Sequence, residues 1–199
     1  MLLDVQDSQL VLVDYQARLM PAMHDTEAVL RNGLRLAHIA RLLEVPAWGT
    51  EQNPERLGHN PEDMRQACRR TLAKMAFGAC DEGLIEWLRP QPAAASGNAR
   101  SLPRHLQKAV PAPARNTVVV AGCEAHVCLL QTALGLLEEE FEVWVVTDAC
   151  TSRTERNRDA AFDRLAAAGA ELLTTEMVTF EWLRSAEHPQ FKAVQALIK

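Results

Sequence analysis

The chain has 199 residues, of which 48% are hydrophobic, so it can bury roughly 70% of its unfolded surface without disulfides or a structural metal. Its formal net charge is −5, and the dispersion of Lys and Arg among acidic residues argues against a nucleic-acid-binding face. Because no apolar run approaches the roughly 20 residues of a membrane span and the N-terminus has no signal-peptide pattern, we expect a cytoplasmic protein without membrane contacts.

Apolar runs and helical periodicities alternate along the chain, as in parallel sheets covered by helices on both faces. The expected strands lie near 9–14, 45–50, 70–74, 116–122, 142–147 and 170–174. The expected helices lie near 25–44, 80–89, 126–140, 155–169, 175–184 and 189–198. Asp25-Thr26-Glu27 is expected to cap the first helix, and Gly169 to close the fourth. We therefore predict an α/β fold of one domain over 1–199, a Rossmann-like three-layer sandwich with strand order 3-2-1-4-5-6.

Two charged residues fall where the predicted strands end. Asp14 closes the apolar strand at 9–14, where a carboxylate can act as a general base; the alternative is a turn or helix-capping aspartate. Lys74 lies in the apolar run 71–77, where its ammonium group loses hydration unless a negative group faces it. The alternative is a surface lysine whose alkyl chain packs on an edge strand.

One segment, 89–116, breaks the alternation because it is rich in Pro, Ala, Ser and Gly. Such composition predicts a surface loop excursion, here with one short helix at 102–109. It does not indicate a second domain.

The segment 117–140, TVVVAGCEAHVCLLQTALGLLEEE, runs from an apolar strand through a turn at Gly122 into a helix whose first turn carries Cys128. The N–H groups and dipole of a helix N-terminus stabilise a thiolate and can lower its pKa from about 8.5 to roughly 3.5–7.5. We therefore expect a reactive thiol, with a buried inert cysteine as the alternative. In the predicted strand order, Asp14 and Cys128 face each other at the topological switch point. The other cysteines are expected to be reduced structural thiols: Cys68, Cys80, Cys123 and Cys150.

The chain resembles the isochorismatase-like cysteine hydrolases in Asp14, Lys74 and Cys128 and in four motifs. The motifs are TEQNPERLG at 50–58, GCEAHVCLLQTA at 122–133, VTDACTSR at 146–153 and HPQFKAVQALIK at 188–199. The resemblance covers nearly the whole chain and is strongest to the isochorismatase domain-containing subgroup. It implies that these three residues form a catalytic trio that cleaves a small amide or related C–N bond through a thioester-type intermediate. It also implies a cis peptide between Cys123 and Glu124, and an oxyanion hole formed by the backbone N–H groups of Glu124 and Cys128.

The chain also departs from the family pattern. Ala125 replaces a usual Thr, and Met75 follows the lysine where Thr or Ser is usual, which bears on substrate contacts. The stretch 49–59 lacks the Asp-x-His pair with which nicotinamidases bind a metal, and His59 stands alone, so we expect no metal and no cofactor and rank nicotinamide low as a substrate. Isochorismatases that cleave a vinyl ether lack the cysteine, so its presence argues against that reaction.

The expected ligand is a small, largely uncharged molecule in an apolar pocket. Residues that follow or flank the strand ends are its candidate contacts, with ordinary packing as the alternative: Tyr15, Gln16, Gln52 and Phe77. Trp48 and Glu51 flank the same strand ends, and Trp48 is expected to pack. Two other functions stay open, a non-catalytic binding protein on the same fold and a redox-responsive thiol protein.

The C-terminal third is rich in apolar and aromatic residues: Val178, Phe180, Trp182, Leu183, Phe191, Val194, Leu197 and Ile198. Two helices this apolar can exceed what one subunit buries, so we expect a homo-oligomer, at least a dimer. The alternative is that both helices pack on their own subunit.

Overall fold

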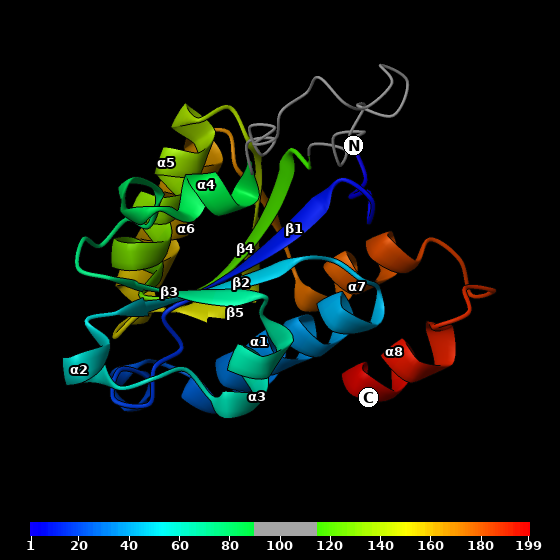
Figure 1. Ribbon diagram of the computed structural model, residues 1–199, viewed down its shortest axis with the longest axis horizontal. Coiled ribbons are helices and arrows are strands. Elements are labelled where there is room, and N and C mark those ends of the chain that lie inside the picture. Colours follow the sequence, from blue (N-terminus) through cyan, green and yellow to red (C-terminus); the bar gives the residue numbers. More distant parts are fainter. Residues whose placement is uncertain (90–114) are drawn as a thin grey trace, which may run out of the picture.

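Figure 1 shows the computed structural model of the chain, which describes residues 1–89 and 115–199. The helix expected at 102–109 lies outside the described residues, as does all but the ends of the excursion expected at 89–116. Within the described ranges, no helix is both long and apolar enough to cross a membrane.

Six strands form one parallel sheet in the order β3-β2-β1-β4-β5-β6, which confirms the predicted fold class and strand order. The strands are β1 (Ser8–Val13), β2 (Ala47–Gln52), β3 (Arg70–Lys74), β4 (Thr117–Cys123), β5 (Glu142–Thr151) and β6 (Glu171–Leu173). All residues of the central strands β1 and β4 are buried. Burial on both faces explains why these strands read as continuous apolar runs rather than as alternating patterns.

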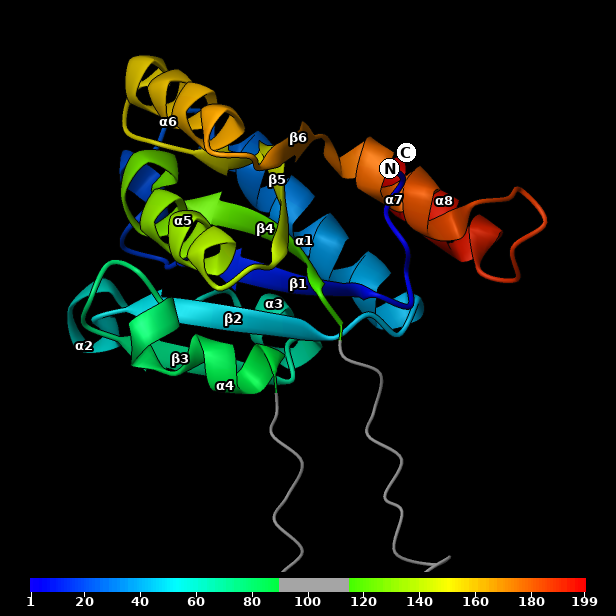
Figure 2. The same cartoon turned by 90° about the horizontal axis from the view of Figure 1, so that it is seen from above.

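Helices cover both faces of the sheet. They are α1 (Thr26–Leu42), α2 (Pro54–Leu57), α3 (Glu62–Ala67), α4 (Leu84–Leu88), α5 (Leu130–Glu138), α6 (Glu155–Ala167), α7 (Thr175–Leu183) and α8 (Phe191–Ile198). The described residues also form the short elements η1 (Met20–Ala22), η2 (Cys80–Glu82) and the π-helical η4 (Ala125–Leu129). α1, α3, α7 and α8 form one layer, and α4, α5 and α6 form the other (Figures 1 and 2).

Several boundaries differ from the prediction. The helix expected at 80–89 is divided into η2 and α4 by Gly83, whose φ is 108°. β5 continues four residues beyond the expected end at 147 because its pairing with β4 resumes after a register shift between Val120 and Gly122. Asp25 lies at the start of α1 but makes no side-chain capping bond, and the Thr26 hydroxyl instead donates to the carbonyls of Met20 and Met23. Gly169 follows α6 with a φ of 101°, as expected of a helix-terminating glycine.

Half of the eight apolar residues named for the C-terminal helices are buried within the chain, and three more are partly buried against its core. Val178, Trp182, Leu183 and Val194 belong to the hydrophobic core. Packing on their own subunit therefore accounts for them, and the argument that they exceed what one subunit buries is wrong for these four. Phe180, however, remains 46% exposed.

Gly122 permits a close approach between the two central strands. Its φ is 141°, and a Cβ at this position would clash with the backbone carbonyl of Val13 on β1. Gly169 also has a positive φ, but nothing lies within 4 Å of its would-be Cβ. Both glycines thus have a positive φ that disfavours other residues, but only at Gly122 would a side chain also clash with a neighbouring strand.

We expect Gly122→Ala to lower the free energy of unfolding by about 2–5 kcal/mol, because strain at positive φ and overpacking add. Gly169→Ala is the matched control and should cost about 1–2 kcal/mol from the backbone conformation alone. Urea denaturation followed by circular dichroism measures both. Equal losses in the two variants would contradict a steric role for Gly122.

Candidate active site

Asp14 lies directly after β1 in a left-handed conformation, with a φ of 52° and a fully buried side chain. Its Oδ1 accepts a hydrogen bond from the Thr50 hydroxyl at 2.6 Å, and its Oδ2 accepts one from Lys74 Nζ at 2.9 Å. Among the described residues these side chains, and not the N–H groups of a helix, bind the carboxylate. Asp14 is therefore not a helix cap.

Lys74 is the last residue of β3, and its side chain is fully buried. Besides Asp14, its ammonium group donates to Gln52 Oε1 at 2.7 Å and to the Phe77 carbonyl at 2.9 Å, with a longer contact of 3.4 Å to the Ala76 carbonyl. A buried ammonium group is tolerated only when its charge and its donors are matched in this way. The surface-lysine alternative is therefore wrong.

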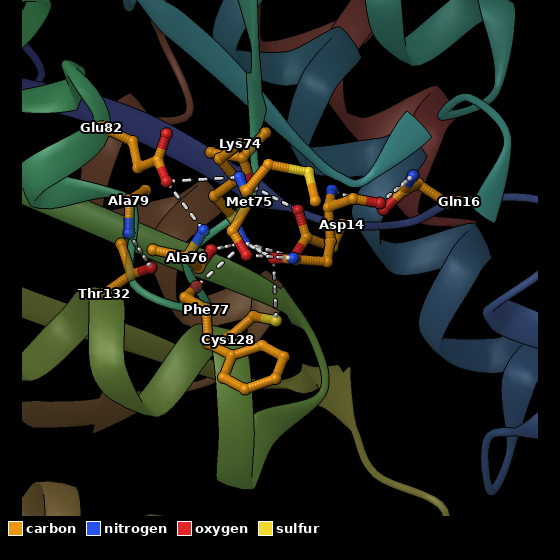
Figure 3. Close-up of polar contacts among 12 residues, drawn as sticks. Asp14, Gln16, Lys74, Met75, Ala76, Phe77, Ala79, Glu82, Cys128 and Thr132 are labelled. Atoms are coloured by element: carbon orange, nitrogen blue, oxygen red, sulfur yellow. Dashed lines mark hydrogen bonds and ion pairs between the residues drawn. The ribbon is translucent and has the colours of Figure 1, made fainter. Parts of the chain in front are cut away.

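Cys128 lies in η4 at the same carboxyl edge of the sheet and is 5% exposed. Its Sγ is 3.9 Å from Gln52 Oε1, the atom that also accepts from Lys74. Figure 3 shows the sulfur at the end of this contact, with Lys74 and Asp14 beyond it. The fold thus brings Asp14, Lys74 and Cys128 together: Asp14 binds Lys74 directly, and Gln52 Oε1 links Lys74 to Cys128.

The pKa of the thiol is not lowered. Burial, followed by the charge of Asp14, raises the pKa of Cys128 to about 12, although Lys74 opposes the shift. The expectation of a lowered pKa at the helix N-terminus is therefore wrong, because removal of the thiolate from water and the nearby carboxylate outweigh the favourable groups. The cysteine is a thiol at neutral pH.

The turn between β4 and Cys128 is held by the loop after β5. The peptide bond between Cys123 and Glu124 is cis. Arg153 donates from Nε and Nη2 to the two carboxylate oxygens of Glu124, both at 2.9 Å. Burial alone would raise the pKa of Glu124, but the hydrogen bonds and charge of Arg153 hold it below its ordinary value. The ring of His126 lies 2.9 Å from the Ser152 hydroxyl on the same loop.

Sequence reasoning missed this clamp of Arg153 on Glu124. The only available signal was that Arg153 ends the motif VTDACTSR. Nothing local in the sequence indicates that this arginine would meet the turn before Cys128, because the contact depends on the pairing of β4 with β5.

The predicted substrate contacts divide into two groups. Tyr15 is fully buried and donates its hydroxyl to the Ala149 carbonyl. Gln16 is also fully buried, and its amide binds the backbone of Gln52 and the Gly58 carbonyl. Packing and backbone support thus describe both side chains, and a substrate contact by either stays a prediction. Phe77 is 52% exposed on the loop that carries the carbonyl bound by Lys74, so it remains available.

The stretch in which nicotinamidases bind a metal is occupied by an internal network. Glu51 accepts from His59 Nδ1 at 2.8 Å and from the Asn60 N–H at 2.9 Å, and Arg65 lies 3.5 Å away. His59 therefore does not stand alone. Across residues 1–89 and 115–199, no group of three or more His, Cys, Asp or Glu is placed to hold a metal ion.

Known proteins are similar to this chain in both sequence and fold. The Isochorismatase domain family model matches residues 8–177. Isochorismatase domain-containing protein 2A of Mus musculus is 32% identical over 195 residues, which cover 98% of this chain and 84% of that protein.

Three solved structures are similar over nearly the whole chain. The MAR1 ribonuclease from Caenorhabditis elegans is 29% identical, with a TM-score of 0.83, and the match covers 100% of this chain and 92% of that one. YcaC from Pseudomonas aeruginosa, solved with hexane-2,5-diol and covalent acrylamide, is 25% identical, with a TM-score of 0.82 and coverage of 98% and 91%. The YcaC gene product from Escherichia coli, described as an octameric hydrolase of unknown specificity, is also 25% identical, with a TM-score of 0.82 and coverage of 98% and 88%. Because the family model spans the sheet from β1 to β6, the chain belongs to the isochorismatase family.

Proposed function

We propose that the protein is a cysteine hydrolase that cleaves a small amide or related C–N bond through a covalent thioester-type intermediate. Membership in the isochorismatase family supports hydrolase chemistry in general. The observation that carries the finer proposal is the fully buried ion pair of Lys74 and Asp14, at 2.9 Å, joined to the Cys128 thiol through Gln52. A buried ion pair is a weak device for stability alone, so its position beside a nucleophile favours a catalytic role.

In the first half-reaction, Asp14 takes the proton of Cys128 as the sulfur attacks the substrate carbonyl carbon. The sulfur–carbon bond forms while the carbonyl electron pair moves onto oxygen. The backbone N–H groups of Glu124 and Cys128 are the proposed donors to that oxyanion, and losing one such donor typically costs about 2.7–4 kcal/mol. The C–N bond then breaks, and Asp14 returns the proton to the leaving nitrogen.

In the second half-reaction, water attacks the thioester. Asp14 takes a proton from the water, the sulfur–carbon bond breaks, and the proton returns to Cys128 as the acid product leaves. The ammonium group of Lys74 pairs with Asp14 before the proton moves, and it stabilises the negative charge that develops on sulfur as the sulfur–carbon bond breaks. The raised thiol pKa fits this sequence, because proton transfer then accompanies attack rather than preceding it.

The proposed substrate class is a small neutral amide. The large apolar side chains near the site, Met75 and Phe77, are exposed, and a charged substrate would gain little from them. The relative from Pseudomonas aeruginosa was solved with covalent acrylamide, itself a small amide. A redox-sensing role is less favoured, because oxidation proceeds through the thiolate, and the buried Cys128 is protonated at neutral pH.

We also propose that the protein forms a homo-oligomer. The relative from Escherichia coli is described as octameric. On this chain, Met177 and Phe180 of α7 are 48% and 46% exposed and line, with Leu2, an open groove of about 470 Å³. This groove is separate from the residues of the candidate active site, so it suits a subunit contact better than a substrate.

Cys128→Ala should reduce hydrolysis by a factor of at least about 10³, because the nucleophile is lost. The control is Cys68→Ala, which removes a half-buried thiol outside the site and should retain activity. The assay is release of ammonia or amine from a panel of small amides. Activity of Cys128→Ala within tenfold of the parent would sink the nucleophile assignment, whereas the absence of hydrolysis in the parent would favour a binding protein.

Asp14→Asn should make the Cys128 thiol more acidic and at the same time slow amide hydrolysis. Removing the carboxylate charge lowers the pKa of Cys128 by about one unit or more, since a like charge disfavours the thiolate. Alkylation of Cys128 by iodoacetamide should therefore reach its half-maximal rate at lower pH than in the parent.

Hydrolysis in the same Asp14→Asn variant should fall by about 10²–10⁴, because the general base is absent. The pH profile of alkylation and the rate of amide hydrolysis measure the two effects side by side. Unchanged hydrolysis would mean that Asp14 is not the base.

Light scattering should give a mass of at least two subunits at micromolar concentration. Phe180→Glu should lower that mass by placing a charge in the exposed apolar surface of α7. Met75→Glu, at another exposed apolar position, should leave it unchanged. A monomer mass for the parent chain would refute the proposal.

A further inference from the structure

Gln52 occupies the centre of the candidate site, although it is not one of the proposed reacting groups. Its side-chain oxygen accepts from Lys74 Nζ at 2.7 Å and lies 3.9 Å from Cys128 Sγ. Its side-chain nitrogen donates to the Met75 carbonyl at 2.7 Å. Both ends of the amide are therefore used inside the protein, and the residue is only 8% exposed.

The orientation of this amide is fixed. An ammonium group can only donate hydrogen bonds, so the oxygen must face Lys74 and the nitrogen must face Met75. The backbone of Gln52 is held as well, because its N–H and C=O pair with the side-chain amide of Gln16 at 2.8 and 3.0 Å. A flipped or swung-out amide would lose these matched contacts.

We propose that Gln52 is a positioning residue that keeps Cys128 in its thiol form until substrate is attacked, an inference that rests on the proposed role of Cys128 as nucleophile. The amide oxygen can accept the S–H proton, but it has nothing to donate to a thiolate. The amide oxygen also accepts one of the three ammonium protons of Lys74. Without the amide, that proton could be donated to the sulfur. Both effects favour the thiol.

Two charged groups face the sulfur. Asp14, after β1, disfavours the thiolate, and Lys74, at the end of β3, favours it. Gln52, at the end of β2, lies between these strands in the sheet and accepts one ammonium proton of Lys74, while Asp14 accepts another. The resting thiol is then less open to oxidation, since oxidants react with the thiolate.

The test measures the rate of Cys128 alkylation by iodoacetamide against pH, with the labelled peptide resolved by mass spectrometry. In this reaction a sulfur–carbon bond forms and iodide leaves, so no turnover is required. Gln52→Met keeps the side-chain length and removes both polar atoms. We expect its midpoint to fall by about one pH unit, which corresponds to about tenfold faster alkylation below the midpoint.

Gln52→Glu should move the midpoint upward, because a second carboxylate then shares Lys74 with Asp14. Gln66→Met is the matched control, since Gln66 lies on α3 and its amide contacts Glu62 outside the site. Its midpoint should equal that of the parent.

An unchanged or higher midpoint in Gln52→Met would overturn the proposal. If circular dichroism shows that this variant is unfolded, Gln52→Leu, which also removes both polar atoms, takes its place, and an unchanged or higher midpoint there overturns the proposal. Failure of the proposed function would look different. The Cys128→Ala variant would keep its hydrolase activity, while the alkylation midpoints of the parent and of Gln52→Met could still be compared.

Discussion

The buried pair of Lys74 and Asp14 is the interaction on which the rest of the site depends. Two full charges lie outside the reach of water, and removing either partner of such a pair typically costs about 3–5 kcal/mol. The pair links the last residue of β3 to the residue after β1, across the end of β2, which lies between these two strands. Each remaining contact follows from satisfying these two charges: Thr50 binds the second carboxylate oxygen, and Gln52 and Phe77 take the remaining ammonium protons.

Burial is the first cause of the raised pKa of the Cys128 thiol, and the carboxylate of the same pair adds to it. A lysine beside a cysteine is commonly associated with a thiolate, but here the carboxylate at 2.9 Å and the amide at 2.7 Å hold the ammonium group. The positive charge of Lys74 is therefore already paired with Asp14 when the thiol is at rest. In the proposed mechanism a base must take the proton during attack, and the buried carboxylate of Asp14 after β1 is the proposed base.

Sequence patterns predicted the fold and the location of the site for a physical reason. Parallel strands bring their carboxyl ends to one edge, so residues that end strands, such as Asp14 and Lys74, must lie near each other once the strand order is known. The order followed from the alternation of strands and helices and from the family motifs.

Other properties could not be predicted, because they depend on neighbours distant in the chain. The pKa of Cys128 is set by burial and by Asp14, and neither is visible in the segment around the cysteine. Tyr15 and Gln16 lie beside a catalytic candidate in sequence, yet they point into the core and toward β2. The Arg153 contact with Glu124 joins two loops that only the finished sheet brings together.

The sheet order has a further consequence, because the site straddles the junction of β1 with β4. Residues 1–89 supply Asp14, Gln52 and Lys74, whereas residues 115–199 supply Glu124, Cys128 and Arg153. A chain severed between residues 89 and 115 would thus yield one fragment with Asp14 and Lys74 and another with Cys128. Complementation of the two pieces would report directly on whether β1 and β4 have paired again, with Gly122 back against Val13.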